Sequence, residues 1–299
     1  MSARRPGLDA RLARGWWSAH RWLLARRAVQ LGILALFLAG PLAGVWIVKG
    51  NLNFSETLGV LPLQDPLVLL QSLLAGHRPG QKVLLGAAIV LALYLLVGGR
   101  SYCAWVCPLN PVTDAASWLR RRLGLSRPSR LSPRLRLGLL AAILVLAAAT
   151  GSLAWELVNP VSIVHRGLVF GMGAAWFLVL AIFLFDLLVV ERGWCGRLCP
   201  VGAFWALVDR PALLRISAGR RQACNDCGDC YVVCPEPQVL KPALKGEREG
   251  RGPLITSSQC THCARCIDVC AEDVFHWSTR FANAARHPIV PLAEAKEKP

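Results

Sequence analysis

Eight cysteines in two copies of one spacing constrain this chain more than any other feature of its sequence. Residues 224–235 read CNDCGDCYVVCP and residues 260–270 read CTHCARCIDVC, so each contains C-x2-C-x2-C-x3-C. This run is typical of bacterial two-cluster ferredoxins, in which the fourth cysteine of one run binds the other cluster. We therefore predict two [4Fe–4S] clusters, the first held by Cys224, Cys227, Cys230 and Cys270 and the second by Cys260, Cys263, Cys266 and Cys234.

Other uses of these cysteines fit the spacing less well. Zinc knuckles would use two C-x2-C pairs and leave four thiolates over, and disulfides are unstable in a reducing compartment. No C-x-x-C-H motif is present, and only His165 among the six histidines is near the end of an apolar run, so haem is not expected. His262 is inside the second cysteine run and is expected to lie on the surface. Without a P-loop, a nucleotide-binding GxGxxG or a nucleophile motif, the chemistry predicted is one-electron transfer.

Four long apolar runs indicate a membrane protein. They cover residues 29–48, 83–97, 137–154 and 168–190, and about 20 helical residues cross a hydrocarbon core of about 30 Å. Residues of the hydrophobic types make up 54% of the chain and charged residues only 17%, and a soluble protein would need a very large core to bury four such helices. We predict an all-α membrane protein with four transmembrane helices and a small C-terminal two-cluster ferredoxin-like module.

The positions of the basic residues predict the orientation in the membrane. The net charge is +16, and arginines are concentrated before the first run and between the second and third. By the positive-inside rule, the N-terminus, the middle loop and the C-terminal third face the cytoplasm of a bacterial inner membrane. Topology and contact with the lipid bilayer thus account for the basic excess, and no support for nucleic-acid binding remains.

The apolar part of the chain contains an internal repeat. Residues 101–108 read SYCAWVCP and residues 193–200 read GWCGRLCP, and each is followed by a short amphipathic stretch, 112–123 or 201–208. This pattern predicts two repeated helix pairs. Helical spacing would place both cysteines of a pair on one face, so the four together could form a second redox or metal site: Cys103, Cys107, Cys195 and Cys199. The alternative is that they are reduced thiols packed at helix ends.

One acidic residue falls inside an apolar run. Asp186 is near the predicted cytoplasmic end of the fourth run, where an ionisable group is costly and by default functional. It could accept a proton from quinol. The alternative is an ion pair with Arg192 or with an arginine of the run 120–122.

The composition divides the chain into four predicted segments. Residues 1–28 form a basic cytoplasmic N-terminus, and residues 29–215 form the transmembrane domain with both C-x3-C-P motifs. Residues 216–281 form the ferredoxin-type domain, and residues 282–299 a disordered tail.

With these features together, the chain resembles the NapH family, the ferredoxin-type membrane component of periplasmic nitrate reduction. The resemblance is carried by the segments GWWSAHRW at 15–22, FLAGP at 37–41, WVCPLNP at 105–111, FDLLVV at 185–190, GWC at 193–195, CPEP at 234–237 and CAEDVF at 270–275. It implies a subunit of a quinol dehydrogenase, rather than a stand-alone enzyme, that passes electrons from membrane quinol toward periplasmic nitrate reductase. The implied partners are a periplasmic iron–sulfur protein and a membrane tetrahaem cytochrome c.

Three other functions stay open at this point. Related membrane ferredoxins serve metalloenzyme assembly, and a methylamine-utilisation counterpart shares the same layout. In the third, the clusters only stabilise a membrane anchor. The quinol hypothesis also requires a route for electrons across the membrane, which the sequence does not identify.

Overall fold

A computed structural model describes residues 6–125, 131–173 and 175–282. The chain divides into two compact units: one is Leu24–Ala212, and the other joins Met1–Leu23 with Leu213–Pro299. We call them the helical unit and the ferredoxin unit. The tail predicted from residue 282 onward lies outside the described residues, apart from its first residue.

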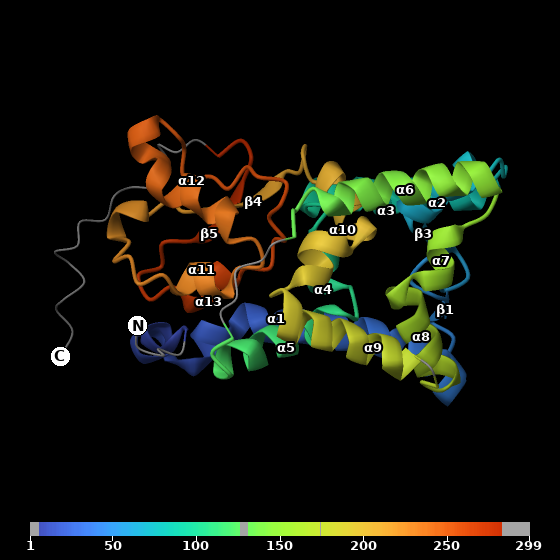
Figure 1. Ribbon diagram of the computed structural model, residues 1–299, viewed down its shortest axis with the longest axis horizontal. Coiled ribbons are helices and arrows are strands. Elements are labelled where there is room, and N and C mark those ends of the chain that lie inside the picture. Colours follow the sequence, from blue (N-terminus) through green and yellow to red (C-terminus); the bar gives the residue numbers. More distant parts are fainter. Residues whose placement is uncertain (1–5, 126–130, 174, 283–299) are drawn as a thin grey trace. The chain divides into compact units, whose positions relative to one another are not determined.

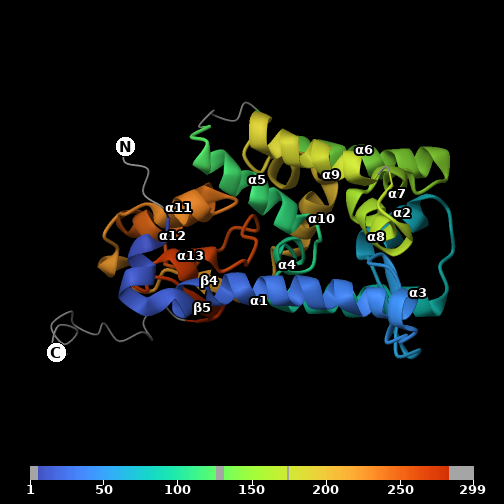
Figure 2. The same ribbon diagram turned by 90° about the horizontal axis from the view of Figure 1, so that it is seen from below.

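The helical unit contains long apolar helices that run in roughly the same direction, with shorter elements between them (Figures 1 and 2). They are α1 (Leu8–Ala43), α3 (Gln81–Val97), α6 (Leu135–Thr150) and α9 (Ala175–Leu184), and the π-helix η1 (Phe185–Val189) continues α9. Within the described residues, α1 alone is both long enough and apolar enough to cross a membrane, judged by length and composition. The other three helices are apolar but shorter. The chain is thus mostly helical, with one long apolar helix near its N-terminus.

One end of this bundle carries a small sheet, which corrects the all-α prediction. Strands β1 (Val48–Gly50), β2 (Phe54–Thr57) and β3 (Leu61–Gln64) pair antiparallel in the order β1-β2-β3. The Asn51 side chain accepts hydrogen bonds from the backbone N–H groups of Asn53 and Phe54, which closes the first hairpin. Helices α2 (Pro66–Leu74), α7 (Ala154–Val158) and α8 (Pro160–Phe170) complete this end.

The other end of the bundle carries the two C-x3-C-P motifs. It consists of α4 (Ser101–Trp105), α5 (Asn110–Arg122), the π-helix η2 (Trp194–Leu198) and α10 (Pro200–Val208). The predicted amphipathic stretches at 112–123 and 201–208 correspond to α5 and α10. Between the repeats, the Trp205 ring stacks on Tyr102 at 5.6 Å and packs at 4.5 Å against Tyr94, measured between ring centroids.

Two of the predicted apolar runs differ from the helices observed. The run at 29–48 extends past the end of α1 at Ala43 into strand β1. The run at 168–190 is not one helix, because α8 ends at Phe170 and Gly171 has a φ of 100°. That left-handed conformation suits glycine and interrupts the helical hydrogen bonds, so α9 begins only at Ala175.

The ferredoxin unit is built from short elements around a compact core. Strands β4 (Leu214–Ser217) and β5 (His276–Thr279) pair antiparallel, with Leu214 opposite Thr279. The helices are α11 (Asp229–Val233), α12 (Leu240–Lys245) and α13 (Arg265–Val269), with 3₁₀ turns η3 (Arg221–Ala223), η4 (Pro237–Val239) and η5 (Gly246–Glu249). The buried core contains Ile216, Leu240, Ile255, Ile267 and Phe275.

The N-terminal segment belongs to this ferredoxin unit, whereas the sequence suggested a separate basic arm over residues 1–28. The first part of α1 kinks at Gly15, whose φ of 79° and ψ of 163° are not helical. Trp22 packs on the ferredoxin core, with its ring 5.4 Å from that of Trp277. The boundary between the units therefore falls within α1, between Leu23 and Leu24.

Gly99 provides a test of how tightly the two repeats pack. A Cβ atom at Gly99 would lie 2.2 Å from the Trp205 carbonyl oxygen and 3.0 Å from the Asp209 nitrogen. These are backbone atoms, which move only if α10 moves. We expect Gly99→Ala to lower the free energy of unfolding by about 1–3 kcal/mol.

The measurement is thermal unfolding of the full chain in detergent. Gly138→Ala is the matched control, since Gly138 is inside α6 and a Cβ there would contact nothing within 4 Å. That substitution should leave stability unchanged or raise it by up to ~1 kcal/mol. Equal stability of the two variants would contradict the close packing of the repeats.

Candidate iron–sulfur centres

The two cysteine runs of the ferredoxin unit fold in the same way. In the first run Asp226 and Gly228 have positive φ values of 59° and 82°. In the second run the equivalent residues, His262 and Ala264, have φ values of 50° and 56°. Such left-handed residues curl a loop so that its backbone N–H groups face a common centre, as in anion-binding nests. Both loops therefore have the shape of a cradle for an anionic group.

Each loop is followed by a one-turn helix that ends at the fourth cysteine. α11 carries Cys230 and ends at Cys234, and α13 carries Cys266 and ends at Cys270. The two helices pack against each other. This packing takes each fourth cysteine away from its own loop and toward the other loop.

The resulting arrangement brings together the cysteines that the spacing pairs. One cavity is lined by Cys224, Cys227 and Cys230 of the first run and by Cys270 of the second. Cys266 interacts electrostatically with Cys260 and Cys263 of its own run, with Cys234 of the first run, and least with Cys230 of the first run. Each group therefore has the thiols required for a [4Fe–4S] cluster, three from one loop and one from the other helix.

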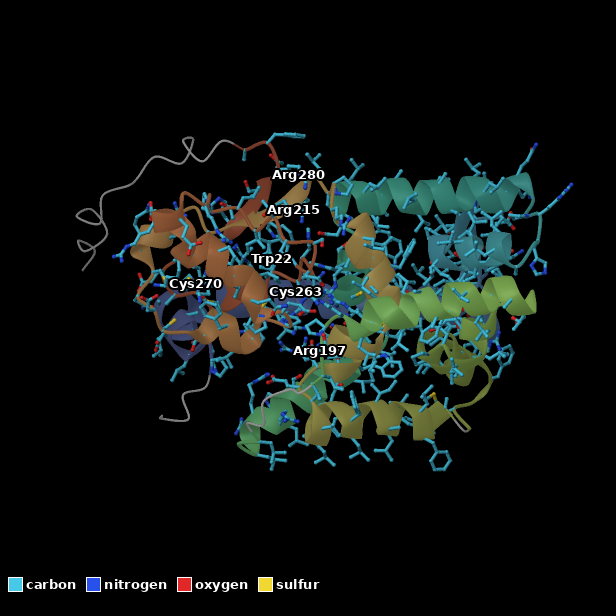
Figure 3. The ribbon with its side chains drawn as sticks, turned by 45° about the horizontal axis from the view of Figure 1, so that its top comes forward. Trp22, Arg197, Arg215, Cys263, Cys270 and Arg280 are labelled. Carbon is cyan, nitrogen blue, oxygen red and sulfur yellow. The ribbon has the colours of Figure 1, made fainter. Side chains whose placement is uncertain are left out.

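The two groups differ in exposure. All three loop cysteines of the second run are buried, whereas Cys227 of the first run is exposed. His262 is 1% exposed, so its predicted surface position was wrong. Cys263 and Cys270 are labelled in Figure 3, together with Trp22.

The chemistry of the thiols also fits a bound metal cluster. Burial, followed by the negative charge of neighbouring thiols, raises the pKa of Cys266 well above its ordinary value. For Cys230 the same causes raise the pKa to about 12. Thiolates in these positions therefore need the positive charge of bound iron, and binding couples to deprotonation.

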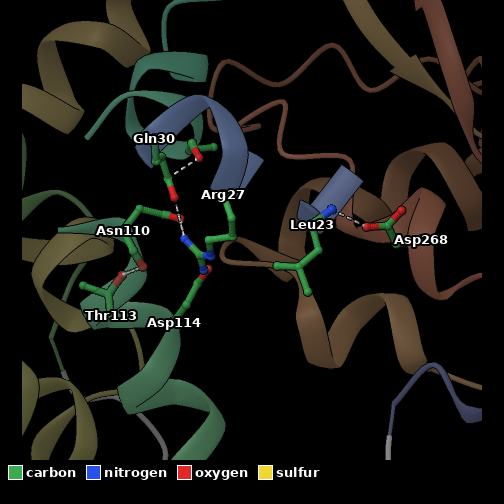
Figure 4. A network of polar contacts seen from close by, with 8 residues as sticks. Leu23, Arg27, Gln30, Asn110, Thr113, Asp114 and Asp268 are labelled. Carbon is green, nitrogen blue, oxygen red and sulfur yellow. Dashed lines mark hydrogen bonds and ion pairs between the residues drawn. The ribbon is translucent and has the colours of Figure 1, made fainter. Parts of the chain in front are cut away.

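Residues at the start of α1 hold α13 in place within the ferredoxin unit. The Arg14 guanidinium donates to the carbonyl oxygens of Ile267 at 2.9 Å and Asp268 at 2.8 Å, and it pairs with Asp273. The Asp268 carboxylate accepts the backbone N–H of Trp22 at 3.2 Å. It also accepts that of Leu23 at 2.9 Å (Figure 4). These contacts flank Cys270, so Arg14 supports a cluster ligand. The positive-inside rule accounts for the N-terminal arginines by topology alone and does not predict this contact of Arg14.

Three of the four remaining cysteines pack against one hydrophobic cluster of the helical unit. Cys103, Cys107 and Cys199 contact this cluster, whose buried residues include Tyr102 and Trp205. Burial raises the pKa of Cys199 to about 11, and it raises that of Cys103 against the opposing effect of Arg100 and Arg136. That all four cysteines form a second redox or metal site stays a prediction.

Both motifs close with the same wide turn. The Cys107 N–H donates to the Tyr102 carbonyl oxygen at 3.0 Å, and the Cys199 N–H donates to the Trp194 carbonyl oxygen at 2.8 Å. These bonds link residues i and i−5, which is the π-helical pattern. The spacing was expected to be α-helical, but both motifs bend more widely, and the aromatic residue of each motif accepts the closing bond.

A buried polar side chain anchors each motif. The Gln30 amide of α1 donates at 2.8 Å to the Ala104 carbonyl oxygen, inside the first motif. Gln30 also accepts from Arg27, which forms an ion pair with Asp114 of α5 (Figure 4). The network therefore ties α1 to the segment that carries Cys103 and Cys107.

Asp186 has the same anchoring position in the second motif. Its carboxylate accepts the Trp194 N–H at 2.9 Å, and Arg120 donates to the neighbouring Leu187 carbonyl oxygen at 2.6 Å. Arg120 and Arg192 both interact electrostatically with the carboxylate. Both roles considered for Asp186, in an ion pair and in accepting a quinol proton, stay predictions.

Glu156 of α7 is bound in a separate polar group. Its carboxylate accepts from the Asn159 amide at 2.8 Å and the Ser162 hydroxyl at 2.7 Å, and the Asn53 amide also donates to it. It therefore links the sheet-bearing loop to α7 and α8.

Comparisons with known proteins agree with both groups of cysteines. A 4Fe-4S dicluster domain model matches residues 223–274, and a 4Fe-4S binding domain model matches residues 80–126 and again 172–221. The chain is 49% identical to the ferredoxin-type protein NapH of Escherichia coli, over 94% of this chain and 97% of that protein. It is 50% identical to NapH of Haemophilus influenzae, over 93% and 96% of the two chains. The chain belongs to the NapH family of ferredoxin-type proteins.

Methylamine-utilisation proteins are similarly related. The ferredoxin-type protein MauN of Methylorubrum extorquens is 50% identical over 92% of this chain and 95% of its own length. No solved structure matches the chain. The predicted resemblance and the predicted [4Fe–4S] cofactors are confirmed, and the chain is a ferredoxin-type iron–sulfur electron-transfer protein.

Arg14 allows the support of Cys270 to be tested. We expect Arg14→Ala to remove hydrogen bonds from a charged donor, each of which contributes roughly 1.5–3 kcal/mol. Iron bound beside Cys270 should then be released faster to a chelator. The measurement is the rate of iron release from the anaerobically purified protein. Arg11→Ala is the matched control, because Arg11 is exposed on the same helix, and equal rates for the two variants would refute the role of Arg14.

Proposed function

We propose that this protein is a membrane component of a quinol dehydrogenase. In this proposal it accepts electrons from membrane quinol and passes them, through its iron–sulfur clusters, toward a periplasmic reductase. The observation that carries the proposal is the combination of eight paired ferredoxin cysteines with a bundle of outward-facing apolar helices. A pair of clusters transfers single electrons, and quinol is the electron donor soluble in lipid.

The exposed side chains of the bundle support a location in the membrane. Large apolar residues point outward from every long helix, for example Leu31 of α1, Leu85 of α3, Val145 of α6 and Phe177 of α9, each more than half exposed. Such a surface is rare on soluble proteins but suits lipid. α3 has 17 residues and so extends about 25 Å, close to the hydrocarbon thickness of about 30 Å. We infer that all four helices cross the membrane, as two repeated pairs.

The charge distribution supports cytoplasmic N- and C-termini. α5 ends with Arg120, Arg121 and Arg122, at the end of the bundle that also carries the cysteine motifs. The opposite end carries the sheet, where Lys82 pairs with Glu56. By the positive-inside rule, the end with the arginines faces the cytoplasm of the inner membrane.

We assign the cluster ligands within this proposal as the spacing predicts. Cys224, Cys227, Cys230 and Cys270 hold the more exposed cluster, and Cys260, Cys263, Cys266 and Cys234 hold the buried one. In this proposal the electrons of quinol continue to a periplasmic iron–sulfur partner and a membrane tetrahaem cytochrome c. Their final acceptor is nitrate reductase.

The similarity to MauN proteins supports a second destination for the electrons. MauN proteins are as similar to the chain as NapH proteins are, at 50% and 55% identity for two of them. Methylamine utilisation is therefore the second candidate. Expression of this chain in strains that lack NapH or MauN distinguishes the two, since only the matching strain should regain growth on nitrate or on methylamine.

Quinol-linked reduction of the clusters tests the proposal directly. We expect a quinol analogue to reduce the clusters in anaerobic membranes, as followed by EPR. In Cys227→Ser, one cluster signal should be lost or altered and the rate of quinol-linked reduction should fall at least tenfold, because a cluster ligand is missing.

Lys241→Ala is the control for that experiment, because Lys241 is exposed on α12 and is not a cluster ligand. It should behave as the wild type. Clusters that dithionite reduces and quinol does not would exclude quinol as the donor and would favour a structural role for the clusters.

A further inference from the structure

The first part of α1 packs against the ferredoxin core through one set of its side chains. Ala10 and Ala19 are 0% and 5% exposed, and Trp22 packs against the buried residues of that core. The Arg14 guanidinium donates to two backbone carbonyl groups of α13. The segment is therefore held against the unit that carries the cluster cysteines.

Other side chains of the same segment are apolar and exposed. Leu12 is 78% exposed, Trp16 is 45% exposed and Trp17 is 75% exposed. The Trp16 ring stacks on His20 at a centroid distance of 4.9 Å and meets the Trp17 ring edge-on at 5.0 Å. Exposing two neighbouring indole rings gives up the free energy that their burial would provide, so these side chains indicate a binding surface.

The segment is also basic. Residues 10–23 contain three arginines and no acid. Arg21 is exposed and follows Trp17 by four residues, which places both on one face of the helix beyond the kink at Gly15. Exposed tryptophan and leucine side chains combined with arginine are typical of segments that lie in the interface of a membrane that contains anionic lipid.

The position of the segment in the chain favours lipid over a protein partner. Among the helices of the described residues, α1 is the one that is long and apolar enough to cross a membrane. Its apolar part begins near Leu24, which follows Trp17 by about 10 Å of helix. With α1 across the bilayer, Trp17 is at the depth of the lipid headgroups.

We propose that Leu12, Trp16, Trp17 and Arg21 form a binding surface for anionic phospholipid in the headgroup layer of the membrane. The apolar side chains insert between the headgroups, and Arg21 pairs with lipid phosphate. This surface rests on the membrane location within the proposed function and depends neither on quinol nor on the terminal reductase. Because the same segment supports α13, which ends at Cys270, lipid binding holds a ligand-bearing helix at the membrane surface.

Hydroxyl-radical footprinting of the full chain tests this surface, because it reports the solvent exposure of single side chains. The chain is reconstituted in nanodiscs of phosphatidylcholine, with or without phosphatidylglycerol, and oxidation is measured by mass spectrometry. Phe281 is 78% exposed in the same unit and serves as the internal reference. We expect the oxidation of Trp17 relative to Phe281 to be about fivefold lower with phosphatidylglycerol, because anionic lipid attracts the basic segment.

Arg21→Gln should remove most of that difference, and so should high salt, because both weaken the attraction to anionic lipid. Trp17→Ser should raise the oxidation of Leu12 and Trp16, because the remaining side chains then insert less deeply. Trp118→Ser is the matched control, since it removes another exposed tryptophan, 54% exposed on α5, and it should leave the oxidation of the segment unchanged. The absorbance of the clusters, retained in every variant, reports that the ferredoxin unit is folded.

Equal oxidation of Trp17 in the two kinds of nanodisc would overturn the proposal. Protection of Trp17 that persists in Arg21→Gln and at high salt would also overturn it, because a protein contact would then cover the surface in place of anionic lipid. A chain that does not enter nanodiscs would refute the membrane location of the proposed function, and this surface with it. The two failures are therefore distinguishable.

Discussion

A [4Fe–4S] cube requires four thiolates in a tetrahedral arrangement, and a short loop can present only three of them. The packing of α11 against α13 solves this problem twice, because each helix takes its terminal cysteine to the opposite loop. The rest of the ferredoxin unit supports this pair of helices. Strands β4 and β5 pair with each other and so join the two ends of the segment that carries both cysteine runs. Arg14, in the N-terminal part of α1, donates to the backbone carbonyl groups near Cys270.

The helical unit presents its cysteines with a different geometry. Each of its motifs carries two cysteines, the second of which closes a π-type turn. The close approach of Gly99 to α10 and the stacking of Tyr102 on Trp205 set this arrangement. Gln30 and Asp186 then fix the backbone of the first and second motif. Polar residues inside apolar helices are costly, and here each one satisfies a backbone group of a motif.

Covalent spacing made the cluster cysteines predictable from sequence, whereas tertiary contacts made other features unpredictable. The C-x2-C-x2-C-x3-C spacing fixes which three thiols a loop can offer. It therefore predicts that Cys234 belongs with the second loop and Cys270 with the first. Arg14 offered no such signal, because an N-terminal arginine that binds two carbonyl groups is indistinguishable in sequence from one that sets topology. The x3 spacing of the other motifs indicated an α-helix, and only the hydrogen bonds of Cys107 and Cys199 identify the π turn.

The unequal burial of the two ferredoxin sites has a consequence for electron transfer. The second site is enclosed, with Cys260, Cys263 and Cys266 all buried, while Cys227 of the first site reaches solvent. Iron bound at the first site is therefore the iron that a redox partner can approach most closely. Solvent exposure and hydrogen bonds also influence the reduction potential of a cluster. The two clusters therefore have different environments, although the backbones of their loops have the same conformation. His262 and Ala264 occupy the positions of Asp226 and Gly228 and share their left-handed backbone, so the two loops keep one fold with different side chains. The difference in exposure within one pseudo-symmetric module thus gives the two clusters unequal access to a redox partner.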